Sequence, residues 1–154
     1  MGIGGVRMQD RFKFRFFNKI ANKMVLPINY ANVDCIYECL AQQVCYDEDI
    51  QPLPYDHIGN GIVFMQCTGL RDKNGKLIYE GDILRSEEYP FKNEESYNYA
   101  AEVLWDDASA TFYYYTFRIS TNVVGRAEGN TGNLNDYEWE VIGNRYENPE
   151  LLED

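Results

Sequence analysis

Two apolar runs flank a polar turn in residues 64–84, FMQCTGLRDKNGKLIYEGDIL. Asn74 and Gly75 stand at the centre of that turn. Asn-Gly is typical of a two-residue type I′ hairpin, because both residues tolerate the positive φ that this turn requires. The segment therefore predicts a β-hairpin, followed by a second turn at 80–82 before the chain re-enters the sheet.

The carboxylate and amide side chains of this segment also suggest a calcium-binding loop. An EF-hand loop needs glycine at its sixth position, oxygen ligands at the first, third and fifth, and glutamate at the twelfth. With Gly75 at position six, Leu70 and Gly81 occupy positions one and twelve, and neither has a ligating side chain. The polar residues are therefore predicted to bend the backbone rather than to hold an ion.

Further strands are predicted by apolar runs and by alternation of apolar and polar residues. The segments are 11–17, 62–68, 101–107, 111–119 and 137–143, and a short turn between the third and fourth predicts a second hairpin. The aromatic content of 15% also favours β-structure.

Apolar side chains at helical spacing predict one helix over 33–46. Residues 1–10 are interpreted as a loose lead-in, and one helical turn is expected within 147–154. The length of 154 residues favours a single domain, with a core that needs no metal or disulfide.

The charge distribution narrows the classes of partner. The net charge is −11, although residues 1–23 hold six basic side chains against one aspartate. So acidic a surface repels phosphate and argues against nucleic acid as a partner.

No apolar run approaches the ~20 residues of a membrane-spanning helix, and no secretory signal is visible. We therefore expect no membrane association and a cytoplasmic location, where the four cysteines remain thiols.

The basic face of strand 11–17 has two interpretations. Arg11, Lys13 and Arg15 alternate with phenylalanines, and such a face could bind nucleic acid through charge and stacking. Alternatively, Glu138 and Glu140 on strand 137–143 could pair with these cations, since opposite charges on adjacent strands attract. We favour the second interpretation and predict that the two strands are neighbours.

Three consecutive tyrosines offer a second candidate binding surface. Tyr113, Tyr114 and Tyr115 must point to both faces of their strand, so at least one of them is expected to be exposed. Exposed aromatic side chains are common at protein interfaces. The alternative is a barrel wall that a loop covers.

Metal and catalytic arrangements are weaker candidates. Cys35 and Cys39 are one helical turn apart but lack the second ligand pair that a zinc site needs. Asp56 and His57 belong to an acidic loop and could join a metal site or, with Cys67, a nucleophilic pair. Loose matches of this kind are mostly false. We therefore expect no metal, no cofactor and no catalytic residues.

Three further stretches accompany residues 64–84 in order: RFKFRFFNKIANKM (11–24), VLWDD (103–107) and EWEVIGNRYENPELL (138–152). Together they resemble the YopX-like family of phage and prophage proteins. The resemblance implies a small SH3-like β-barrel or roll. Together with the predicted helix and long loops, this gives an expected fold class of mainly β (α+β). It also implies a phage or prophage origin, a bacterial cytoplasm and self-association, and it carries over no catalytic residues.

These observations favour a non-enzymatic module that binds another protein or itself. The candidate binding residues are Arg11, Lys13, Arg15, Tyr113 and Tyr115. The alternative is a role linked to nucleic acid, either through the basic strand or through an acidic surface that acts as a decoy for a DNA-binding protein.

Overall fold

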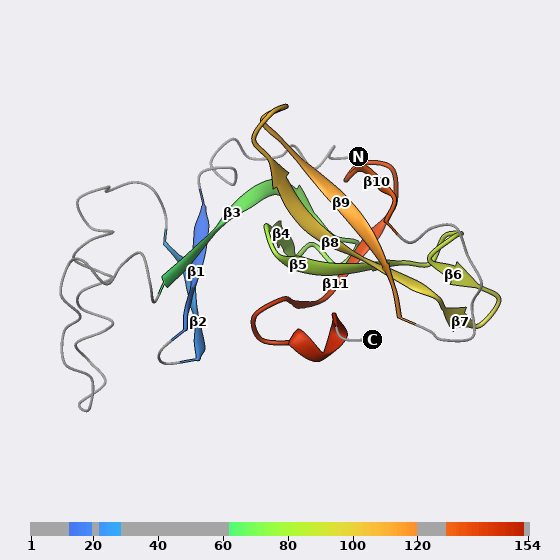
Figure 1. Cartoon of the computed structure of the whole chain (residues 1–154), viewed down its shortest axis with the longest axis horizontal. Coiled ribbons are helices and arrows are strands. Elements are labelled where there is room, and N and C mark those ends of the chain that lie inside the picture. Colours follow the sequence, from blue (N-terminus) through green and yellow to red (C-terminus); the bar gives the residue numbers. More distant parts are fainter. Residues whose placement is uncertain (1–12, 20–21, 29–61, 120–128, 153–154) are drawn as a thin grey trace.

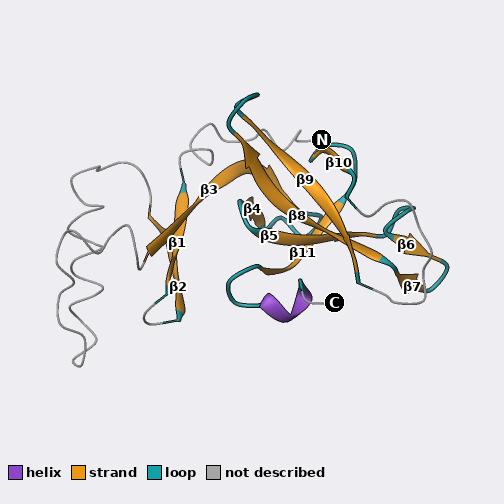
Figure 2. Cartoon of the chain, viewed as in Figure 1, coloured by secondary structure: helices purple, strands orange, loops and turns teal. Residues whose placement is uncertain are grey.

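The computed structural model describes residues 13–19, 22–28, 62–119 and 129–152, and these ranges are mainly β-structure (Figure 2). Their one helical element is a 3₁₀ turn at Pro149–Leu151, in the C-terminal segment where a helical turn is predicted. The described strands are β1 (Phe14–Asn18), β2 (Lys23–Ile28), β3 (Ile62–Arg71), β4 (Leu77–Tyr79), β5 (Asp82–Ser86), β6 (Lys92–Asn93), β7 (Ser96–Tyr97), β8 (Tyr99–Asp106), β9 (Thr111–Arg118), β10 (Thr131–Asn133) and β11 (Trp139–Asn144).

The strands form two larger antiparallel sheets and a small hairpin. The N-terminal sheet has the order β2-β1-β3-β4, the central sheet has the order β10-β9-β8-β5-β11, and β6 pairs with β7. The long strand β3 runs from beside β1 toward the central sheet (Figure 1). Over the described ranges the sheets are not closed into a barrel, so the predicted SH3-like barrel is not confirmed. The hairpin predicted for 101–119 is present as β8 and β9.

An aromatic cluster forms the centre of the core, on the inner face of the central sheet. Phe91 is 1% exposed and packs edge-on against Tyr137 and Trp139, with ring centroids 4.9 Å apart in both pairs. Tyr114 packs edge-on against Trp139 at 5.2 Å. Edge-to-face packing is favourable because the positive ring edge meets the negative ring face. Phe91 lies between β5 and β6, outside the strands predicted from the sequence, so its burial was not predicted.

The hairpin predicted at Asn74-Gly75 is present, but its turn type differs. The N–H of Asp72 donates to Lys76 O (2.8 Å), and the N–H of Gly75 donates to Asp72 O (2.9 Å). Of the two central residues, only Gly75 has a positive φ, at 82°. The loop is therefore a type I turn followed by a left-handed glycine, rather than type I′, and Asn-Gly is compatible with both.

Asp72 stabilises this turn and ties it to the central sheet. Its buried carboxylate accepts two N–H groups of its own turn through Oδ1 (both 2.9 Å) and the N–H of Val141 through Oδ2 (3.1 Å). The N–H of Lys73 donates to Trp139 O (2.8 Å). The tip of the β3–β4 hairpin is thus hydrogen-bonded to the edge of β11 that faces away from β5. As predicted, polar residues of this segment shape the backbone, and the structure adds the bonds to β11, which were not predicted.

The predicted pairing of strands 11–17 and 137–143 is wrong. The first corresponds to β1 in the N-terminal sheet, and the second to β11 in the central sheet. Glu140 instead contacts Arg85 of β5 (3.1 Å) and Lys73 (3.0 Å). The rule that opposite charges attract across strands holds, but several strands carry cations, so charge alone did not select the neighbour.

A buried ion pair connects the two sheets. Arg15 Nη2 lies 2.5 Å from Asp82 Oδ1, and the two side chains are 10% and 0% exposed. The Arg15 guanidinium also lies over the ring of Tyr79, 4.7 Å from its centroid, and the Tyr79 N–H donates to Asp82 Oδ2 (2.8 Å). Burial raises the pKa of Asp82 above its ordinary value, and Arg15 opposes that effect. The pair holds β1 against the turn that leads into β5.

Some predictions fall on residues that the structure does not describe. The predicted helix at 33–46 and the lead-in at 1–10 lie outside the described residues. In the ranges that are described, no helix is long and apolar enough to cross a bilayer.

Candidate protein-binding surface

β9 presents a row of aromatic side chains on the outer face of the central sheet. Its pairing with β8 has no bulge, so successive β9 residues point to opposite faces. Tyr114 is buried on the inner face. Tyr115 on the outer face is 39% exposed, and its neighbours in the row, Tyr113 and Phe117, are half-buried. We call Tyr113, Tyr115 and Phe117 the β9 surface.

An ion pair on β8 adjoins the β9 surface. Glu102 stands directly opposite Tyr115 in the ladder, and its Oε1 lies 2.9 Å from Arg145 Nη1. The side chain of Glu102 is 11% exposed, whereas that of Arg145 is 43% exposed. A cation that water can reach therefore lies beside the aromatic row. Tyrosine and arginine are both enriched at protein interfaces.

Burial raises the pKa of several ionisable groups around Glu102 and Arg145. It raises the pKa of Glu102, with Arg145 as the opposing influence. It also raises the pKa values of Glu80 and Tyr146, and on the inner face it raises the pKa of Tyr114 to about 12. A carboxyl group with a raised pKa can serve as a general acid or base. Here the direct contact between Glu102 and Arg145 gives the carboxylate a structural role, because it fastens the segment after β11 to β8.

A groove of about 470 Å³ lies at the end of the β9 surface, where β9 and β10 meet the β8–β9 turn. Its polar lining includes Asp106, whose pKa is lowered chiefly by a hydrogen bond from Ser109. Its lining residues are Asp106, Ser109, Thr111, Phe112, Tyr113, Thr131, Gly132 and Asn133. Tyr113 thus belongs to both the aromatic row and the groove, which makes the two features continuous.

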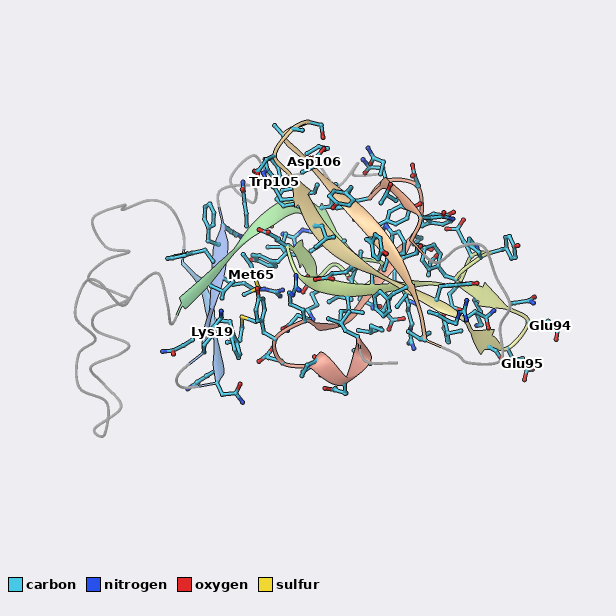
Figure 3. All side chains as sticks on the ribbon, viewed as in Figure 1. Lys19, Met65, Glu94, Glu95, Trp105 and Asp106 are labelled. Atoms are coloured by element: carbon cyan, nitrogen blue, oxygen red, sulfur yellow. The ribbon has the colours of Figure 1, made fainter. Side chains whose placement is uncertain are left out.

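Trp105 adds an aromatic side chain that the sequence reasoning did not select. It lies at the tip of the β8–β9 hairpin next to Asp106 (Figure 3) and is 37% exposed. Its Nε1–H donates to Asp107 Oδ1 (2.9 Å), and its ring packs edge-on against Phe112 at 4.8 Å. The available signal was its position one residue before the strand ends, where fewer neighbours cover a side chain.

Of the basic residues predicted to bind, Lys13 and Arg15 are described, and these two do not form an exposed face. Arg11 lies outside the described residues. Lys13 is half-buried, and its carbonyl accepts the N–H of Cys67 (2.9 Å). Arg15 is buried and paired with Asp82. The alternation of strand 11–17 predicts that Arg15 points to solvent, whereas the fold places Asp82 against it.

The metal and cysteine candidates are mostly beyond the described residues. Cys35, Cys39, Asp56 and His57 all lie there. Within the part of the chain that is described, no three metal-binding side chains gather. Cys67 is buried in β3, and its Sγ accepts the N–H of Gly69 at 3.4 Å.

A family model described as YopX protein matches residues 13–153. The chain belongs to the YopX family. The match extends from the start of β1 to the residues after the 3₁₀ turn, so it includes both larger sheets and the β9 surface. The resemblance seen in the sequence is therefore confirmed.

Solved structures include a chain similar to this YopX protein. The crystal structure of protein EF1440 from Enterococcus faecalis shares 27% sequence identity with it, covers 92% of this chain and 97% of its own, and gives a TM-score of 0.49. No curated protein matches the chain.

Proposed function

We propose that this YopX protein is a phage- or prophage-encoded module that acts in the cytoplasm of a bacterial host. It binds another protein and catalyses no reaction. The YopX family membership supports the phage assignment, and the β9 surface supports the binding role. The partner contacts the aromatic row of β9 and the groove that continues from it.

The observation that carries this proposal is the exposure of Tyr115 in the middle of a regular, fully paired strand. A tyrosine held by a sheet offers a large contact area and loses little conformational freedom on binding. Tyr113 and Phe117 extend the apolar area, and Arg145 adds a cation beside it. A rigid aromatic row bordered by charge has the composition of a protein interface.

Direct binding of nucleic acid has less support. Arg15 is engaged with Asp82, so it offers no contact to a phosphate. The net charge of −11 further opposes an approach to nucleic acid. A protein partner requires neither an exposed basic face nor a positive net charge.

A photoreactive phenylalanine analogue placed at position 115 tests the proposal in bacteria that express the protein. We expect one dominant covalent adduct with a host or phage protein, identified by mass spectrometry. The matched control carries the same analogue at Glu150, which is exposed on the 3₁₀ turn that follows β11. In the central sheet, β8 and β5 separate β11 from β9. Tyr113→Ser in the position-115 background should reduce the yield of the adduct.

Equal adduct patterns at 115 and 150 would contradict the assignment of the β9 surface. A salt-dependent shift of the protein with DNA or RNA in a gel would favour the nucleic-acid alternative, since phosphate contacts weaken steeply as salt rises.

A further inference from the structure

One end of β9 extends past the strand that borders it. β10 pairs with β9 only over residues 113–115, whereas β9 begins at Thr111. Within the described residues, no strand therefore lies beside Phe112 on the side away from β8. The groove of about 470 Å³ opens at this point, and Thr111, Phe112 and Tyr113 all line it. An open stretch of strand edge thus faces a space of the size that ligands occupy.

The backbone groups of Phe112 point into this space. In an antiparallel ladder, successive residues direct their N–H and C=O groups to opposite sides of the strand. The Thr116 N–H donates to Asn130 O (2.8 Å), on the β10 side of β9. Phe112 comes four residues before Thr116, so its N–H and C=O point to the same side. The Phe112 carbonyl accepts a long bond from Thr111 Oγ1 (3.4 Å), which leaves a lone pair for a second donor.

The end of β10 that is nearest the groove is closed by its own turn. The Asn133 N–H donates to Asp136 Oδ2 (2.8 Å), and Asn133 O accepts the N–H of Asp136 (2.9 Å). These bonds occupy the groups that β10 would offer there to an incoming strand. Phe112 of β9 is therefore the position where a strand can be added beside the groove.

The groove and its surroundings are acidic. Among the described residues that line it, Asp106 is the only one with a charge, and the hydrogen bond from Ser109 lowers its pKa, so it is ionised at neutral pH. Asp107 follows at the exposed hairpin tip, and Asp136 is bonded to the lining residue Asn133.

No cation of the described residues neutralises these carboxylates. Neutral groups donate hydrogen bonds to all three of them. The ion pairs in the described part of the chain use other carboxylates, those of Asp82, Glu87, Glu102 and Glu140. The charge around the groove therefore favours a basic ligand.

We propose that the segment of the partner that contacts this protein is an extended, basic peptide, which adds to β9 as a strand beside Phe112. Its main chain exchanges hydrogen bonds with the N–H and C=O of Phe112. Its alternate side chains lie over Tyr113 on one face and Phe112 on the other, and its cations face Asp106 and Asp107. Strand addition of this kind takes affinity from the main chain and specificity from alternate side chains. This assignment rests on the proposed function, because it names the kind of protein segment that the β9 surface and its groove accept.

Selection from a display library of random linear peptides against the full chain tests the proposal. We expect the enriched peptides to be rich in Lys and Arg and to bind more weakly as salt rises, because exposed charges are screened. The double variant Asp107→Asn with Asp136→Asn removes two charges but keeps both hydrogen-bond acceptors, so it should weaken an enriched peptide several-fold. Glu95→Gln, between β6 and β7, is the matched control and should leave the affinity unchanged. Circular dichroism confirms that each variant is folded.

NMR identifies the main-chain contact. When an enriched peptide is added, hydrogen exchange at the Phe112 amide should slow at least about tenfold, because the new bond protects that N–H. The Tyr113 amide points to β8 and should keep its exchange rate. In a scan of N-methylated peptides, one position should lose about tenfold in affinity while its two neighbours tolerate the change, since only alternate peptide N–H groups face β9.

Three results would overturn this inference: no enrichment of linear peptides, enrichment of peptides without basic residues, or equal exchange at the Phe112 amide with and without peptide. Unchanged affinity in the double aspartate variant would do the same. If any of these accompanies a dominant adduct from position 115, the proposed function stands and the extended basic peptide is excluded. If the adduct is also missing, both are contradicted.

Discussion

Asp82 is wholly buried, so the ionised carboxylate depends on the cation beside it. That cation is Arg15, 67 positions away in the sequence. A buried charge that loses its partner has neither water nor an ion to stabilise it, and the penalty is larger than the net gain from forming the pair. The two residues therefore act as a unit.

Arg15→Met tests this dependence. We expect the free energy of unfolding, measured by urea titration, to fall by about 3–5 kcal/mol, because Asp82 remains buried without a cation. Adding Asp82→Asn should recover part of the loss, since asparagine is neutral and can still accept the Tyr79 N–H. Lys19→Met, at an exposed turn residue, is the control and should change stability by no more than about 0.5 kcal/mol. Equal effects of Arg15→Met and Lys19→Met would contradict the interpretation.

The turn after β3 provides a second test at the scale of one residue. Gly75 has a φ of 82° and no atom within 4 Å of the position of an added Cβ, so Gly75→Ala meets backbone strain but no clash. We expect a loss of about 1–2 kcal/mol in thermal or urea unfolding. Asn74→Ala should change stability by less than about 0.5 kcal/mol, because Asn74 has no positive φ to support. A type I′ turn would make the two substitutions similarly harmful.

Single-residue predictions from the sequence succeeded where the cause is local. Alternation along 111–119 predicted that at least one of the three consecutive tyrosines is exposed, and Tyr115 is, because the side-chain period of a strand depends on the backbone alone. The same rule left Arg15 on a solvent face. Its burial depends on Asp82, and no local pattern indicates which remote residue a side chain will meet.

Among the elements, the β3–β4 hairpin and β11 depend on one carboxylate. Asp72 accepts two N–H groups of the turn and one of β11, so its loss affects both elements at once. Buried N–H groups that lose their acceptor are expensive, since water cannot replace it.

Asp72→Ala should lower the free energy of unfolding by at least about 2 kcal/mol. It should also speed hydrogen exchange at the Val141 amide, measured by NMR. Lys73→Ala is the control: it removes the exposed side chain that contacts Glu140 but keeps the Lys73 N–H bond to Trp139, and exposed ion pairs contribute only about 0–1 kcal/mol. Slow exchange at Val141 in Asp72→Ala would contradict the anchoring role.

The elements themselves were easier to predict than their neighbours. The hairpins β3–β4 and β8–β9 join segments that are close in sequence, and turn residues indicate them. The neighbours of β1 and β11 could not be predicted, because cations on several strands offer Glu140 an equivalent partner. Arg85 and Lys73 took that place.

At the scale of the whole molecule, charge is unevenly distributed along the sequence, because residues 1–23 hold six basic side chains against one aspartate in a chain with a net charge of −11. Lys19 lies at the turn after β1, and Glu94 and Glu95 lie at the tip of the β6–β7 hairpin, at the opposite end of the long axis (Figure 3). Family membership and the mainly β class were predictable from motifs and alternation. Whether the sheets close is a property of the complete strand order, which no single motif encodes.

The stability of the molecule should respond to pH in two opposite ways. The pKa of Glu102 is raised by burial, so the folded state binds that proton more tightly, and its contribution declines as pH rises from the ordinary value of 4.5 through the raised pKa. The pKa of Glu140 is lowered chiefly by its hydrogen bond from Arg85, so its contribution is present above 4.5 and lost as pH falls below it.

Unfolding measured across this pH range in two variants separates the effects. With rising pH, the wild type should lose stability relative to Glu102→Gln. With falling pH below 4.5, it should lose stability relative to Glu140→Gln. The same direction of change in both comparisons would show that these two carboxyl groups do not act as their contacts suggest.

The hairpin tip bonded along β11 also bears on solubility. A strand at the border of a sheet offers N–H and C=O groups to any extended chain that approaches, and this is a common route to aggregation. In this protein Asp72 and Lys73 occupy two of those groups, at Val141 and Trp139. We therefore expect that opening the tip would leave the edge of β11 free to pair with other strands and would favour aggregation.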